Sequence, residues 1–221
     1  LQNVFNPQLY QRMFDQHEQG SESIGKYLTP FIYISILITL FLALFSEELL
    51  IILTPVSYHG AIPIVTILCM YFGLGVIAKI TGTQLIYSKK THISTLTSIS
   101  SIATHIGLNI PFIMKWGAVG AAWATMFAGL INCFISIMFA QHYYKVDYEW
   151  NKIVWIIATF FTGSSIIAMM NLLDLPYLWS FLVKMTTMIV FIYLGQRYGI
   201  LTRNNYNEVR SVFRFENIPV T

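Results

Sequence analysis

The sequence carries little charge. Asp, Glu, Lys and Arg make up only 10% of its 221 residues, whereas ordinary soluble domains carry roughly 25%. Hydrophobic residues account for 56% of the chain. So few charged side chains do not cover the surface of a soluble domain of this length, and the composition therefore indicates an integral membrane protein.

Cysteine is also scarce, which argues against a disulfide-rich protein and against a protein with a cysteine-ligated metal. Cys69 and Cys133 both lie inside apolar runs, where a thiol behaves as a small hydrophobic group. We expect no disulfide framework, no metal site and no cofactor. The chain opens at Leu1 in a polar stretch without a basic segment leading into an apolar one. We therefore expect no signal peptide, and a chain that lacks its N-terminal part.

Long hydrophobic runs are abundant. A bilayer core of about 30 Å requires roughly 17 to 25 apolar residues in a helix. Six segments fit, and four of them contain no Asp, Glu, Lys or Arg; they lie at residues 27–45, 61–87, 93–114, 118–140, 153–173 and 177–195. The linkers between them are short. The sequence predicts an all-α, polytopic transmembrane bundle of about six helices arranged as hairpins.

This pattern divides the chain into four parts. We expect a cytoplasmic loop at 1–26, four helices at 27–140, two additional transmembrane helices at 141–195, and a basic cytoplasmic tail at 196–221. Lys and Arg favour the cytoplasmic side of a membrane. Ten of the thirteen fall on one side of this arrangement and only Lys115 falls on the other. The sequence therefore places both ends of the chain in the cytoplasm.

Two lysines lie inside the hydrophobic segments. Lys79 is about 15 Å from the Lys89–Lys90 turn along a helix, with Gly75, Gly82 and Thr83 on the same helical face. We favour an orientation toward a cavity over snorkelling to the headgroups. Lys184 lies seven residues into the last segment, where Asp174 is a candidate partner. We interpret Glu47, Glu48 and His59 of the 46–60 linker as solubilising residues rather than a gate.

Segment 93–114 carries a polar stripe at helical spacing. Its members are Ser94, Thr97, Ser98, Ser101, Thr104, His105 and Asn109, opposite a face of isoleucines. The stripe either lines a hydrated path or joins helices through hydroxyl hydrogen bonds, and we favour the second for the serines and threonines. His105 either titrates near neutral pH or stays neutral against a carbonyl group, and we favour the neutral form.

Small residues mark the entry to segment 118–140. Gly117, Ala121, Ala124 and Ala128 are spaced by four, three and four residues and share one face. Small side chains allow close approach of helix backbones in lipid. We expect a neighbouring helix to pack there, as a plain contact in preference to a sliding one.

The order of features resembles a known family. The stretch NPQLYQRMF precedes LFSEELLIILTPVSYHGAIPIVTILCMYF, which is followed by YSKKTHISTLTSISSIATHIGLNIPFIMKWGAVGAAWATMFAGL. This succession resembles the C-terminal portion of bacterial polysaccharide or O-antigen flippases, the Wzx-type branch of the multidrug/oligosaccharidyl-lipid/polysaccharide exporter superfamily. The matching positions are Tyr58, Ala61, Lys89, Lys90, Asn109, Pro111 and 117–122, and the likeness is strongest over 45–130.

The resemblance implies translocation of a polyprenyl-diphosphate-linked oligosaccharide across a bacterial inner membrane by alternating access. It implies Lys79, His105, Asn109 and Lys184 as substrate contacts, and membrane lipids and other surface-polysaccharide assembly proteins as partners. The alternatives are a drug exporter or a peptidoglycan-precursor flippase of the same superfamily, or a membrane-bound glycan polymerase or acyltransferase. We expect no enzyme, because the sequence shows no cluster of acid, base and nucleophile in a sizeable loop. The net charge of +3 is not gathered on a soluble face, so we expect no nucleic-acid partner.

Overall fold

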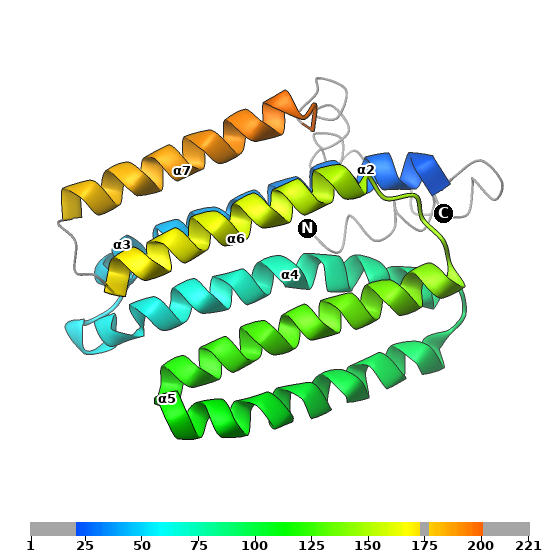
Figure 1. Ribbon diagram of the computed structural model, residues 1–221, viewed down its shortest axis with the longest axis horizontal. Coiled ribbons are helices and arrows are strands. Elements are labelled where there is room, and N and C mark those ends of the chain that lie inside the picture. The colour runs from blue at the N-terminus through cyan, green and yellow to red at the C-terminus, as the bar shows by residue number, and fades with distance from the viewer. Residues whose placement is uncertain (1–20, 173–176, 201–221) are drawn as a thin grey trace, which may run out of the picture.

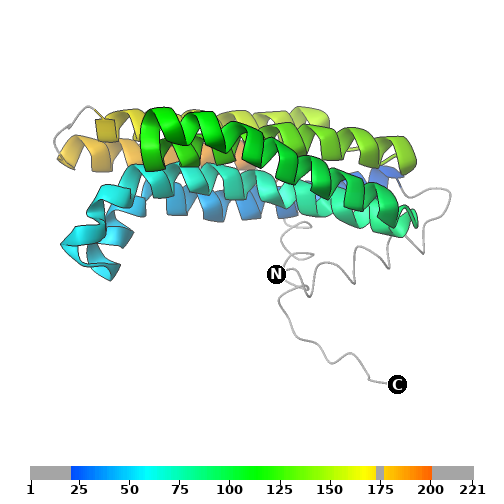
Figure 2. The same ribbon diagram turned by 90° about the horizontal axis from the view of Figure 1, so that it is seen from below.

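The computed structural model describes residues 21–172 and 177–200, and its regular structure there is entirely helical. The helices are α2 (Ser21–Leu44), α3 (Ser46–Leu53), the 3₁₀ helix η1 (Val56–Ala61), α4 (Ile62–Tyr87), α5 (Thr91–Tyr143), α6 (Trp150–Leu172) and α7 (Tyr177–Arg197). The long helices lie side by side in one bundle (Figure 1). From below, α6 and the second half of α5 form a layer over α2 and α4 (Figure 2).

Four helices are long and apolar enough to cross a membrane, at Ile24–Leu44, Val56–Tyr87, Thr91–Tyr143 and Tyr177–Arg197. This agrees with an all-helical membrane protein. Six crossings, as the sequence predicts, require each half of α5 to cross once and α6 to cross as well.

Helix α5 is a hairpin rather than one straight rod. Its 53 residues are interrupted at Gly117, whose φ of 59° and ψ of −137° are not helical. Only glycine adopts this conformation without strain. At Gly120, a side chain would run into the carbonyl group of Phe112, so the two halves approach closely just after the turn. The reversal separates predicted segments 93–114 and 118–140, as expected, and Figure 1 shows it as the sharp bend of α5.

Two boundaries differ from the sequence prediction. Helix α2 begins at Ser21, six residues before the expected start of its hydrophobic segment. The 46–60 linker is not an open loop, because it contains α3 and most of η1. Helix α3 places Glu47 and Glu48 in its first turn, where acidic side chains interact favourably with the positive end of the helix dipole.

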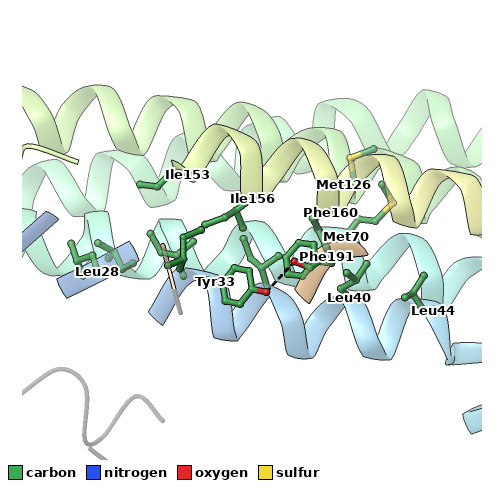
Figure 3. Packing of buried hydrophobic residues seen from close by; sticks show 14 of the residues in the cluster. Leu28, Tyr33, Leu40, Leu44, Met70, Met126, Ile153, Ile156, Phe160 and Phe191 are labelled. Atoms are coloured by element: carbon green, nitrogen blue, oxygen red, sulfur yellow. Dashed lines mark hydrogen bonds between the residues drawn. The ribbon is translucent and has the colours of Figure 1, made fainter. Parts of the chain in front are cut away.

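The core lies where α2, α4, α6 and α7 meet. Phe160 of α6 packs against Gly73 of α4, where a larger side chain would collide with its ring. The Tyr33 ring stacks on Phe191 with centroids 5.1 Å apart, and its hydroxyl donates to the Phe191 carbonyl oxygen at 3.1 Å. Figure 3 shows this hydrogen bond among the buried side chains. Close packing therefore joins α7 to α2 in the second half of α7.

The loop between α5 and α6 is fixed to the end of α4. The Tyr148 hydroxyl donates to Gln84 Oε1 at 2.9 Å, and Gln84 Nε2 donates to the Tyr144 carbonyl oxygen at 3.2 Å. Burial raises the pKa of Tyr148, so its phenol group stays protonated and remains a donor. These bonds hold the end of α4 that follows Lys79.

The outer face of the first half of α5 is apolar. Its isoleucines are exposed, and they are Ile99, Ile102, Ile106, Ile110 and Ile113. Soluble monomers rarely expose a continuous apolar face of this kind. A helix that turns a row of isoleucines outward fits a hydrocarbon environment.

Candidate functional site

A cavity of about 640 Å³ lies between α2, α4 and the first half of α5. Helix α4 supplies Lys79, Gly82 and Thr83 to its wall. The other residues that line it are Phe31, Ser35, Ile38 and Thr39 of α2, Val76, Ala78, Ile80 and Ile86 of α4, and Ser94 and Ser98 of α5. We call this cavity the Lys79 groove. Its walls combine one ammonium group, five hydroxyl groups and apolar side chains.

Lys79 is an exposed residue on this wall. Among the described residues, no carboxylate lies within ion-pair distance of its ammonium group, in contrast to those of Lys152 and Lys184. An ammonium group without a counter-charge inside a hydrophobic segment needs water or an anionic ligand. The Lys79 groove therefore has the charge to receive an anion.

Three of the five hydroxyl groups of the groove, those of Thr39, Thr83 and Ser98, are bonded to their own helices. Thr39 donates to the Ser35 and Ile36 carbonyl oxygens at 3.1 and 3.0 Å. Thr83 donates to the Lys79 carbonyl oxygen at 3.1 Å, and Ser98 donates to that of Ser94 at 2.9 Å. Because their protons are used in this way, these oxygens face a ligand mainly as acceptors. Such acceptors suit the hydroxyl and amide groups of a sugar.

His105 and Asn109 do not line the groove. The His105 ring lies edge-on to Tyr71 of α4, with centroids 5.9 Å apart. Asn109 Nδ2 donates to the His105 carbonyl oxygen at 2.8 Å. Gly75, expected on the Lys79 face, is also absent from the lining. The structure thus brings Lys79 together with Ser94 and Ser98, while His105 of the polar stripe packs against α4.

The polar stripe does not join helices in the way that we favoured. Thr97 donates to the Ser94 carbonyl oxygen at 2.8 Å, and Thr104 donates to that of Ser100 at 2.8 Å. Like the bonds of Ser98 and Asn109, these run within α5. Threonine and serine side chains reach the carbonyl group one turn back more readily than a neighbouring helix. The contact of α5 with α4 therefore depends on packing.

The small-residue face shows where that packing is closest. Ala124 and Ala128 are fully buried, and Ala121 is half-buried. Gly129, next to Ala128, lies against the Tyr71 ring of α4, where a side chain would collide with the ring. Gly117 is exposed at the turn, so it lies outside this packed face.

A second lysine site lies between α3 and α7. Lys184 Nζ is 2.8 Å from Glu47 Oε2 and 2.8 Å from Glu48 Oε1, and a third bond of 3.0 Å reaches Glu48 Oε2. The Lys184 side chain is 0% exposed, while those of Glu47 and Glu48 are 27% and 17% exposed. We call these three residues the Lys184 cluster. It holds the first half of α7 against α3.

The start of α3 is itself fixed to α4. Ser46 Oγ and Thr66 Oγ1 lie 2.8 Å apart in a buried hydrogen bond, and Ser46 also donates to the Ala43 carbonyl oxygen at 3.0 Å. The two carboxylates of the Lys184 cluster are therefore carried on an anchored helix. The interpretation of Glu47 and Glu48 as solubilising charges is wrong, because both pair with a buried lysine.

Asp174, the expected partner of Lys184, lies outside the described residues. The carboxylates that do pair with Lys184 precede it by more than 130 residues. The sequence contained a signal for this pairing. A lysine inside an apolar segment needs a counter-charge, and Glu47 and Glu48 are two adjacent acidic residues at the start of another apolar stretch.

Within residues 21–172 and 177–200, no three His, Cys, Asp or Glu side chains are grouped so that they could hold a metal ion. The chemistry that the described residues offer is the cationic Lys79 groove and the closed Lys184 cluster. Comparisons with protein-family models, curated proteins and solved structures found no match to this chain.

Proposed function

We propose that this chain is part of a membrane translocator that moves a polyprenyl-diphosphate-linked oligosaccharide from the cytoplasmic to the external leaflet. The observation that carries the proposal is the Lys79 groove, a cavity of about 640 Å³ lined by hydroxyl-bearing side chains. Its ammonium group has no carboxylate partner within residues 21–172 and 177–200. The resemblance to polysaccharide flippases supports the same function. No covalent step is assigned to the protein.

The three parts of such a substrate make different demands. A diphosphate that enters a hydrocarbon layer needs a cation, and Lys79 supplies one. Sugar hydroxyl groups need polar partners, and the oxygens of Ser35, Thr39 and Ser98 face the same groove. The polyprenyl tail needs an apolar surface, which Ile38 of α2 and Val76 and Ile86 of α4 provide in the wall of the groove. One groove with an apolar flank thus suits the whole amphiphile.

Transport needs the groove to open to each side of the membrane in turn. In this proposal the chain forms one helical lobe with six crossings, both of its ends are cytoplasmic, and a further lobe completes the cavity. The membrane is a bacterial inner membrane, and the partners are other proteins of surface-polysaccharide assembly. Lys79 meets the substrate about halfway across the bilayer core, about 15 Å along α4 from Lys89.

The test is complementation in a bacterium that lacks its surface-glycan flippase, using the full-length gene. We expect the unchanged gene to restore surface glycan, Lys79→Ala to reduce it by about tenfold or more, as the loss of one charge-assisted bond implies, and Lys79→Arg to retain part of it. Lys115→Ala is the matched control, because it removes a lysine at the α5 turn, away from the groove. Protein abundance is measured by blot.

Two outcomes contradict the proposal in different ways. If Lys79→Ala restores glycan fully, the groove lysine does not contact the substrate. If the unchanged gene fails with several glycan types, a drug exporter or a membrane-bound glycan polymerase becomes the better assignment.

A further inference from the structure

Helix α7 is attached to the bundle in two chemically different ways. Its second half is close-packed: Thr187 lies against Gly163 of α6, and Gly195 lies against the Tyr33 ring of α2, at positions where a larger side chain would collide. Its first half is held by the ion pairs of the Lys184 cluster. Two apolar contacts add to these: the edge contact of Phe181 with Phe45, whose ring centroids are 6.4 Å apart, and the packing of partly buried Val183 against the core.

These two kinds of contact respond differently to water. Close apolar packing around glycines is not replaced by any interaction with water or ions. The carboxylates of Glu47 and Glu48 are partly exposed, so water and cations reach them and compete for the ion pair. The attachment of the first half of α7 is therefore the one that can open.

The Lys184 ammonium group also has an alternative location outside the cluster, in the headgroup layer. It lies seven residues after Tyr177, the first residue of α7, which is about 10 Å along the helix. A lysine side chain at this depth reaches the headgroup layer by extending toward the end of its helix. The ammonium group thus has carboxylate partners in the cluster and polar headgroups or water after release, and its two positions differ by a swing of the first half of α7.

We propose that the Lys184 cluster is a releasable clamp, which holds the first half of α7 on α3 and lets it swing about the close-packed second half. The clamp opens at the end of the bundle that carries α3 and closes when Lys184 returns to Glu47 and Glu48. This inference does not depend on the proposed substrate.

The experiment measures two distances by electron spin resonance in the full-length protein in lipid nanodiscs. Spin labels at Leu178→Cys and Ile166→Cys report on the first half of α7, and labels at Tyr193→Cys and Val154→Cys report on its second half; all four positions are exposed on α7 or α6. The background carries Cys69→Ala and Cys133→Ala, which removes the two buried thiols of the described chain.

For the first pair of labels, the unchanged cluster is expected to give a main short distance and a minor longer one, since minor states of such equilibria hold roughly 0.1–10% of the molecules. Lys184→Met should enlarge the longer population by about tenfold or more, because a clamp without its cation no longer favours the closed state. The second pair should not change. Lys184→Arg should keep the original distribution, because it keeps the charge.

Lys152→Met is the matched control, since it breaks the Lys152–Glu149 pair of 2.6 Å at the start of α6 and leaves α7 alone. Glu48→Gln, which keeps Glu47 as a partner, is the milder variant if Lys184→Met does not fold. A single short distance in the unchanged protein overturns the proposal, as does an equal distribution in all variants. A change at both label pairs overturns the swing, because α7 would then move as a whole.

Discussion

The two lysines inside the helical bundle lie in opposite surroundings. Lys184 has no exposed surface and makes three short bonds to Glu47 and Glu48. Lys79 is exposed on the wall of a cavity, and among the described residues no carboxylate pairs with it. In the sequence both are single lysines in apolar segments. Their difference in the structure separates a charge that holds helices together from a charge that is available to a ligand.

This difference shows that the role of a cation inside a membrane helix depends on which partners the protein supplies for it. The cost of placing a charge among apolar helices must be offset by a partner or by water. Where the protein supplies the partner, as at Lys184, the charge stabilises the protein's own structure. Where it supplies only a groove and hydroxyl groups, as at Lys79, the charge needs water or a ligand.

The largest effect is expected from Lys184→Met. The change leaves two carboxylates facing each other without their cation, and breaking a buried pair in this way costs about 3–5 kcal/mol, with the lower end applying because Glu47 and Glu48 are partly exposed. We expect a clear loss of thermal stability in detergent, measured by the unfolding midpoint. Lys184→Arg is the control and should recover most of that stability. An unchanged midpoint in Lys184→Met would contradict the structural role of the cluster.

A carboxylate added beside Lys79 should make it resemble Lys184. Gly75 lies one turn before Lys79, and a side chain there meets no atom within 4 Å. In Gly75→Glu, the new carboxylate is placed to pair with Lys79, because residues four apart are neighbours on a helix. We expect translocation to fall by about tenfold, the value of one charge-assisted bond to the substrate.

Gly75→Gln is the control for the size of the new side chain, and it should leave translocation nearly unchanged. Both variants are compared in the complementation assay at equal protein abundance. Equal loss in the two variants would indicate blockage of the groove rather than pairing with Lys79.

The smallest effect is expected from Lys79→Ala on stability. An exposed lysine with no carboxylate partner among the described residues contributes little, so the free energy of unfolding should change by no more than about 0.5 kcal/mol. The unfolding midpoint of the purified protein measures this directly. A loss as large as that of Lys184→Met would mean that Lys79 has a structural partner, and the contrast between the two lysines would fail.

Much of the fold can be predicted from the lengths of the hydrophobic segments alone. Each predicted segment falls on a helix, and the turn at Lys115, Trp116 and Gly117 was expected from its polar and small residues. Helix α3 was missed because eight residues between two long segments look like a linker when only spans of bilayer length are counted. The same omission led to the interpretation of Glu47 and Glu48 as solubilising charges, which is wrong because both pair with Lys184.

The candidate site was predictable only in part. Lys79, Gly82 and Thr83 share a helical face in the sequence, and they do line one cavity. Helical spacing within one segment does not say which residues of another helix stand opposite. The contributions of Ser35 and Thr39 from α2 therefore required the structure, as did the pairing of Lys184 with Glu47 and Glu48.

The most direct test of the central claim is the binding of undecaprenyl diphosphate to the purified full-length protein in nanodiscs, measured as a Kd. We predict that Lys79→Ala raises this Kd by about tenfold or more, the value of one charge-assisted hydrogen bond, while Lys115→Ala leaves it unchanged. An equal Kd for the unchanged protein and Lys79→Ala would contradict the assignment of the Lys79 groove as the site that receives the diphosphate.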